Sequence, residues 1–170
     1  MNRQGLKPFA EDLSENQHLV VVTNREPYLH KLVESGLKVE RPVGGLTSAL
    51  DAVMKVAGGT WVAWGSGSGD RQAGGRIEVP PEHPQYGLRR VWLPPALVDS
   101  YYHGYSNQVL WPLCHMTLDR VYFRRRFWEA YGKANALFAD AVVEEAPDAA
   151  AVWIHDYHLC LLPELLRKRR

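Results

Sequence analysis

The sequence predicts an α/β fold in which helices flank a core of parallel strands. Two patterns support this prediction: short apolar runs of strand length recur along the chain, and segments with helical periodicity separate them. The 170 residues are 46% hydrophobic and 23% charged, as in a folded globular protein rather than a disordered one. A chain of this length forms about one domain and buries a sizeable core.

The first predicted elements are a strand, a helix and a second strand. Residues 19–23 (Leu-Val-Val-Val-Thr) are a continuous apolar run, which is typical of a parallel strand buried on both faces. A loop is expected over residues 24–27, because a proline in it prevents an immediate helix. A helix is expected over residues 44–57, where two glycines end it, and residues 60–64 (Thr-Trp-Val-Ala-Trp) form the next strand. This order indicates a βαβ unit.

The rest of the chain continues this alternation. Prolines mark the turn between two strands, and periodic apolar residues indicate later helices. The expected elements are a flexible loop over 65–75, strands over 76–79 and 88–93, a helix from Pro95 toward Tyr102, a helix over 123–145, a strand over 151–155 and a helix over 157–169.

Charge and cysteine content argue against several classes of protein. Lys and Arg number 20 against 19 Asp and Glu, so the net charge of +1 gives no reason to expect nucleic acid or a membrane surface as partner. Basic clusters at 124–126 and 167–170 lie in expected helices, where solvated faces explain them. The two cysteines lack CxxC spacing, which argues against a disulfide framework or a structural zinc site.

The N-terminal residues do not resemble a targeting segment. Residues 1–17 are polar and mixed in charge, without the apolar centre of a signal peptide. No run approaches the ~20 apolar residues of a membrane-spanning helix. We therefore expect a flexible arm over residues 1–18, one domain over residues 19–170 and a cytoplasmic location.

Two features near the first strand and helix are candidates for binding a phosphate. The first N–H groups of a helix have no internal partner, so Gly44 and Gly45 form an anion site at a helix start; a plain tight turn is the alternative. Arg25 follows the first strand, and ligands of α/β sheets gather beyond the carboxyl ends of strands. Its guanidinium can hold a phosphate through two N–H bonds; a surface arginine without a ligand is the alternative.

Two later segments are candidates for binding a sugar. Asp156 directly follows an expected strand, where a carboxylate accepts hydrogen bonds from sugar hydroxyls or from a neighbouring helix start. Residues 101–112 are rich in tyrosine and tryptophan, which suit the polar edges and apolar faces of a sugar; core packing is the alternative. His155 and His158 suggest a metal site, but their spacing across a strand–helix junction makes us expect none.

Together these segments resemble the retaining glycosyltransferase family of trehalose-6-phosphate synthases, glycosyltransferase family 20. The matching stretches appear in the family's order and cover the chain from residue 19 to its end. They are Leu19-Val-Val-Val-Thr-Asn-Arg25, Gly44-Gly-Leu46, Trp61-Val-Ala-Trp64, Tyr101-Tyr-His-Gly-Tyr-Ser-Asn-Gln-Val-Leu-Trp-Pro112 and Trp153-Ile-His-Asp-Tyr-His-Leu159. Each stretch alone is modest evidence, whereas five in order favour binding over the plainer alternatives.

The resemblance implies the Rossmann-like N-terminal domain of a two-domain GT-B enzyme. The implied reaction transfers glucose from a nucleotide-glucose donor, with UDP-glucose expected, to glucose 6-phosphate and yields α,α-trehalose 6-phosphate. The resemblance implies no cofactor and no metal ion, and the leaving phosphate itself takes the acceptor proton. The family's C-terminal donor-binding domain is absent from this chain, so we expect a truncated acceptor side that is inactive alone. A homo-oligomer is left open.

The resemblance also implies roles for individual residues. Arg25 holds the acceptor's phosphate, with help from Tyr102. Asp156 binds acceptor hydroxyls at the catalytic centre, and Trp111 lines the acceptor pocket. The remaining implied positions are Gly44 and Gly45, which present N–H groups to the donor diphosphate, and Trp64, at the border of the pocket.

Three rival interpretations remain. A glucosylglycerol-phosphate synthase of the same family would keep these motifs and use glycerol 3-phosphate as acceptor. A non-catalytic regulatory paralogue would keep the fold, although the presence of Arg25, Tyr102 and Asp156 argues against a pocket without a function. An unrelated Rossmann-like nucleotide-binding module is disfavoured, because no GxGxxG follows the first strand.

Overall fold

The computed structural model describes residues 18–148 and 150–169. The expected N-terminal arm over residues 1–18 lies outside the described residues, apart from His18. Within the described ranges, no helix is both long and apolar enough to cross a membrane.

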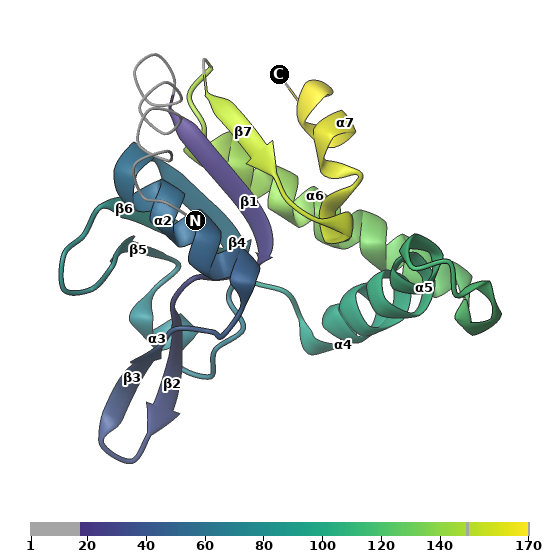
Figure 1. The fold of residues 1–170 in the computed structure, drawn as a ribbon, viewed down its shortest axis with the longest axis horizontal. Helices are drawn as coiled ribbons and strands as arrows, with labels where there is room; N and C mark the ends of the chain where they lie inside the picture. Colours follow the sequence, from purple (N-terminus) through teal and green to yellow (C-terminus); the bar gives the residue numbers. More distant parts are fainter. Residues whose placement is uncertain (1–17, 149, 170) are drawn as a thin grey trace.

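A five-stranded sheet forms the centre of the fold (Figure 1). Its order is β5 (Arg76–Val79), β6 (Tyr86–Val91), β4 (Thr60–Trp64), β1 (Leu19–Arg25) and β7 (Ala151–Ile154). All neighbouring pairs are parallel except β5 with β6, which is antiparallel at one edge. The chain runs from β1 to β4 and β6 on one side and then crosses to β7 on the other. The predicted α/β class with a parallel core is confirmed.

Helices cover both faces of this sheet, which explains why β1 begins with an uninterrupted apolar run (Figure 1). On one face, Met54 of α2 (Gly45–Ala57) packs in a buried cluster with Val21 of β1. On the other face, Phe138 of α6 (Arg125–Glu145) packs in a second cluster with Val20 and Val22. Successive side chains of a strand point to opposite faces, so an uninterrupted apolar run serves both clusters.

The aromatic segment that follows β6 is helical over its whole length. It consists of α4 (Pro95–Val98), a π-helix η1 (Asp99–Leu110) and α5 (Trp111–Cys114), followed by the short 3-10 helix η2 (Leu118–Arg120). The helix predicted from Pro95 toward Tyr102 therefore exists but continues to Cys114. It packs against α6, with Tyr101 fully buried in the cluster of that face.

Two segments between residues 26 and 75 differ from the sequence-based prediction. The connection after β1 contains a hairpin, β2 (Leu29–Val33) and β3 (Gly36–Glu40), which projects from the body in Figure 1. The loop predicted to be flexible over residues 65–75 contains a helical turn, α3 (Asp70–Ala73). Asp70 is fully buried and accepts the backbone N–H of His30, so the loop is packed against the hairpin.

Several element bounds also differ: α6 begins two residues later than predicted, and β7 ends one residue earlier. β1 extends to Arg25, two residues beyond its predicted end. β6 begins and ends two residues earlier than predicted, and Arg90 within it forms a buried ion pair with Glu26. The predicted helix over 157–169 is divided into η3 (Tyr157–Leu159) and α7 (Leu162–Arg167). Pro163 lies in the first turn of α7, where a proline starts a helix rather than continuing one.

Candidate functional site

A cavity of about 420 Å³ opens at the carboxyl ends of β1 and β7. The sheet order reverses between these two strands, and ligands of open α/β sheets bind at such a switch point. The cavity is lined by the end of β1, the start of α2, the η1–α5 helical segment and the segment after β7. Six of the seven predicted site residues line it: Arg25, Gly44, Gly45, Tyr102, Trp111 and Asp156.

Two hydrogen bonds fix the end of β1 against η1. Arg25 donates from Nη2 to the hydroxyl of Tyr102 over 3.3 Å, near the surface. The preceding residue Asn24 accepts a 2.9 Å hydrogen bond from the hydroxyl of Tyr101 in the buried interior. The hydrogen bond with Tyr102 raises the pKa of Arg25 above its ordinary value, so the guanidinium stays charged. The cavity therefore holds a fixed positive charge at one end.

Asp156 lies just past β7 and supplies the cavity's carboxylate. Its backbone has φ 75° and ψ 161°, a left-handed conformation that is uncommon for a residue with a side chain. This conformation lets Oδ1 accept the backbone N–H of Tyr157 over 2.7 Å, which caps η3. Oδ2 lies 3.5 Å from Nδ1 of His158. The carboxylate is thus held in one orientation and remains partly exposed.

An aromatic stack forms one wall of the cavity. The imidazole of His158 is stacked between Tyr102, with ring centroids 5.4 Å apart, and Tyr157, with centroids 4.2 Å apart. Tyr157 in turn lies 5.9 Å from the ring of Trp111. Burial lowers the pKa of His158 to about 4, and the charge of Arg25 adds to this effect while Asp156 opposes it. His158 is therefore a neutral member of the wall at physiological pH.

The start of α2 contributes backbone N–H groups to the cavity. Gly44 precedes the helix and Gly45 is its first residue, and the first turn carries no acidic side chain. The first N–H groups of a helix have no partner within it. A Cβ atom placed on Gly45 would meet no atom within 4 Å, so the space above this residue is open. The glycine pair therefore leaves the helix start open to the cavity.

Trp64, the seventh predicted residue, lies in a side compartment of about 270 Å³ rather than in the main cavity. Arg25 and Tyr102 line both spaces, so they form the boundary between them. The ring of Trp64 lies 6.0 Å from that of Tyr102. Glu26 and Ser66 also line the side compartment. A ligand that extends past Arg25 from the main cavity into the side compartment would occupy both spaces.

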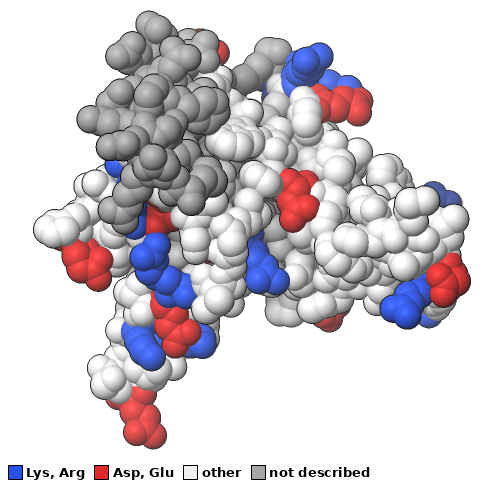
Figure 2. Space-filling view, in the orientation of Figure 1, with Lys and Arg blue, Asp and Glu red and all other residues white. Residues whose placement is uncertain are grey.

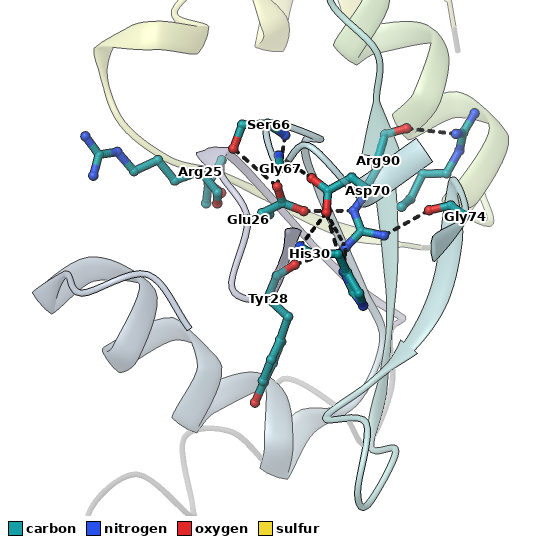
Figure 3. A network of polar contacts seen from close by, with 11 residues as sticks. Arg25, Glu26, Tyr28, His30, Ser66, Gly67, Asp70, Gly74 and Arg90 are labelled. Carbon is teal, nitrogen blue, oxygen red and sulfur yellow. Dashed lines mark hydrogen bonds and ion pairs between the residues drawn. The ribbon is translucent and has the colours of Figure 1, made fainter. Parts of the chain in front are cut away.

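A cluster of buried charges behind the side compartment was not predicted from the sequence (Figure 3). Arg90 is fully buried and donates from Nε to Oε2 of Glu26 over 2.8 Å and from Nη2 to the carbonyl of Tyr28 over 3.0 Å. Its Nη2 also lies 3.3 Å from Oδ1 of Asp70. Only the unusual charge content of residues 89–90 within a strand offered a signal for this cluster.

The distribution of charge on the surface bears on how a charged ligand would be attracted. On the face shown in Figure 2, basic and acidic side chains are interspersed rather than gathered into one extended patch. The positive features of the cavity itself are Arg25 and the start of α2. Among the described residues, no three His, Cys, Asp or Glu side chains are grouped so as to hold a metal ion.

Comparison with known proteins identifies similar chains. A family model described as glycosyltransferase family 20 matches residues 17–170. The UDP-forming alpha,alpha-trehalose-phosphate synthase 1 of Aspergillus fumigatus is 37% identical over an alignment of 172 positions, which covers 95% of this chain and 32% of that protein. The chain thus spans about a third of the length of this curated relative.

Solved structures give the same result. A structure from E. coli, bound with UDP-2-fluoro glucose, has a TM-score of 0.69 and 35% identity and covers 90% of this chain and 30% of its own. A UDP-forming alpha,alpha-trehalose-phosphate synthase from Burkholderia xenovorans, in complex with glucose-6-phosphate, has a TM-score of 0.67 and 27% identity. It covers 89% of this chain and 31% of its own.

Proposed function

The chain belongs to glycosyltransferase family 20, and on that basis we propose that it is the acceptor side of a retaining glucosyltransferase. The reaction moves glucose from UDP-glucose to glucose 6-phosphate and yields α,α-trehalose 6-phosphate. Relatives named as UDP-forming synthases, together with complexes of a UDP-glucose analogue and of glucose-6-phosphate, support this choice of donor and acceptor. The chain corresponds to the Rossmann-like N-terminal domain of a GT-B enzyme, and a second domain binds most of the donor.

The observation that supports this proposal most directly is that Arg25 and Asp156 line one cavity together with the start of α2. Arg25 and Tyr102 hold the phosphate of the acceptor, because a fixed guanidinium beside a hydroxyl provides charge-assisted hydrogen bonds. Asp156 accepts hydrogen bonds from the acceptor's hydroxyls, and Trp111 offers an apolar face to its ring. Two separate contacts orient the hexose and lower the entropic part of the barrier.

The donor diphosphate lies against Gly44 and Gly45. The N–H groups at the start of α2 and the helix dipole stabilise the negative charge that develops on the leaving diphosphate. The bond between the sugar's C1 and the diphosphate oxygen breaks while the acceptor oxygen bonds to C1 on the same face. The acceptor's proton passes to the departing phosphate oxygen. This scheme requires no pair of carboxylates flanking the bond, in contrast to a glycosidase.

The test is product identification with a full-length protein that contains this chain. UDP-, GDP- and ADP-glucose are each offered with glucose 6-phosphate or with glycerol 3-phosphate, and products are identified by mass spectrometry and NMR. We expect α,α-trehalose 6-phosphate from UDP-glucose. A glucosylglycerol phosphate would instead support the acceptor of the related synthases, and no transfer with any pair would contradict the proposal. The 170-residue chain alone is expected to release no nucleoside diphosphate.

A further inference from the structure

Glu26 directly follows Arg25 but points to the other side of the chain (Figure 3). Whereas Arg25 is exposed at the cavity, the side chain of Glu26 is 1% exposed and lies among buried charges behind the side compartment. Its Oε1 accepts the backbone N–H of Ser66 over 2.9 Å, and its Oε2 accepts from Arg90. Arg25 and Glu26 therefore line the same side compartment, which has a buried carboxyl group in its wall.

The buried cluster contains more acidic groups than permanent positive charges. Glu26 and Asp70 supply two carboxyl groups, and Arg90 supplies one guanidinium. Arg90 also donates from Nη2 to Nδ1 of His30 over 2.9 Å. Because arginine only donates, Nδ1 of His30 must be an acceptor, and the imidazole is neutral. With both carboxyl groups ionised, the cluster would carry one uncompensated negative charge.

An uncompensated charge in the interior is costly, and a buried carboxyl group avoids it by keeping its proton. Burial, and next the adjacent Asp70, raise the pKa of Glu26 to about 8, while Arg90 and the N–H of Ser66 act in the opposite direction. At neutral pH the Glu26–Asp70 pair therefore holds one proton. The cluster of Glu26, Asp70, Arg90 and His30 is then neutral overall.

We propose that the proton held by Glu26 and Asp70 makes the side compartment able to accept a dianionic phosphate beside Arg25. This inference rests on the proposed function, because the phosphate is that of the acceptor. Loss of the proton places a negative charge behind the bound phosphate and weakens its binding. Glu26 is thus a residue that controls affinity through charge, without being a catalytic group.

The charged and titratable groups around Glu26 come from four elements. They are Arg25 beside it, His30 on β2, Asp70 on α3 and Arg90 on β6. Arginine stays charged throughout the range in question. Burial lowers the pKa of His30, and hydrogen bonds lower that of Asp70 against the effect of burial, so neither titrates near pH 8. A transition near pH 8 in this cluster therefore belongs to Glu26.

Thermodynamic linkage between proton binding at Glu26 and phosphate binding gives a direct test of the inference. If a proton on Glu26 favours phosphate binding, then bound phosphate favours the proton to the same extent. Binding of glucose 6-phosphate to the 170-residue chain is measured by titration calorimetry at pH 8, in two buffers with different ionisation enthalpies. The sugar phosphate is already dianionic there, since its second pKa is ~6. We expect wild type to take up a fraction of a proton and its affinity to fall about fivefold or more from pH 7 to pH 9.

The variant Glu26→Gln keeps the shape of the side chain and removes its ionisation. We expect it to bind glucose 6-phosphate with no proton uptake at pH 8 and with an affinity that does not change from pH 7 to pH 9. The matched control Glu34→Gln, on the exposed hairpin, is expected to behave as wild type.

The outcomes separate this inference from the proposed function. Binding by wild type without proton uptake, or equal uptake in wild type and Glu26→Gln, would overturn the inference and leave the acceptor site intact. Absence of any binding by wild type between pH 6.5 and pH 9 would overturn the acceptor site itself. Because proton uptake by wild type can by itself contradict the inference, a poorly folded variant does not prevent a decision about it.

Discussion

Arg25 donates a hydrogen bond to the hydroxyl of Tyr102, a residue 77 positions later in the chain. The residues that precede them, Asn24 and Tyr101, are also joined by a hydrogen bond. The Tyr101–Asn24 bond is buried and the Arg25–Tyr102 bond is exposed. The buried bond therefore helps to hold Arg25 and Tyr102 opposite each other. The guanidinium is therefore positioned before any ligand arrives, which reduces the entropy lost on binding.

Arg25→Ala is expected to abolish most of the affinity for glucose 6-phosphate without unfolding the chain. A hydrogen bond to a charged group contributes ~1.5–3 kcal/mol, so the dissociation constant should rise about ten- to a hundredfold. Arg25 is exposed, and removing it leaves the core intact. The measurement is the increase in melting temperature caused by glucose 6-phosphate. Arg120→Ala, an exposed arginine outside the cavity, serves as the control, and an equal effect of both variants would contradict the prediction.

Gly45→Ala is expected to weaken donor binding while leaving the fold stable. The added methyl group meets no atom of the chain within 4 Å, but it occupies the space in which the diphosphate approaches the start of α2. In the full-length enzyme, we expect KM for UDP-glucose to rise at least tenfold and KM for glucose 6-phosphate to change little. Gly132→Ala in α6 also meets nothing within 4 Å and is the matched control. Equal donor KM values in both variants would argue against a diphosphate at Gly45.

The sequence was sufficient to predict the elements that bring the site together. The strand over residues 60–64 has the predicted bounds, and the helix after Gly44 ends at Ala57 as expected. Parallel strands place their carboxyl ends at one edge, so residues after two such strands meet there. This reasoning is enough to bring Arg25 and Asp156 into one cavity.

The sequence was not sufficient to predict features that depend on tertiary contacts. The β2–β3 hairpin has a mixed polar and apolar sequence, and tertiary hydrogen bonds attach it to the body, among them the bond from the backbone N–H of His30 to the side chain of Asp70. Asp70 follows a glycine- and serine-rich run that is typical of a mobile loop, yet Arg90 and the hairpin enclose it. The stacking of His158 between two tyrosines likewise joins η1 to η3, which no local pattern indicates.

Tyr101→Phe is expected to destabilise the chain and to loosen Arg25. The change removes the donor to Oδ1 of Asn24, whose Nδ2 already has no hydrogen-bond partner among the described residues. A buried polar group left without a partner costs ~1–3 kcal/mol. Thermal unfolding measures this loss, and Tyr122→Phe at the exposed surface is the control. Equal melting temperatures for Tyr101→Phe and wild type would show that the buried hydroxyl contributes nothing.

His158 is expected to make the chain less stable in acid. Its pKa is about 4 in the folded state and close to 6.5 when unfolded, so the unfolded chain binds more protons between these values. The stability due to neutral His158 is complete above pH ~6.5 and is lost toward pH 4, with a slope of at most ~1.4 kcal/mol per pH unit. His158→Phe keeps a ring between Tyr102 and Tyr157 and cannot be protonated.

The difference in unfolding free energy between wild type and His158→Phe isolates this effect. His30 and the acidic groups titrate in both proteins, so their contributions cancel in the difference. Urea unfolding at pH 7, 6, 5 and 4.5 gives the free energies. We expect wild type to lose stability relative to the variant as the pH falls from 6.5 to 4.5. Parallel curves over this range would contradict the prediction, because they would mean that His158 is protonated as easily in the folded chain as in the unfolded one.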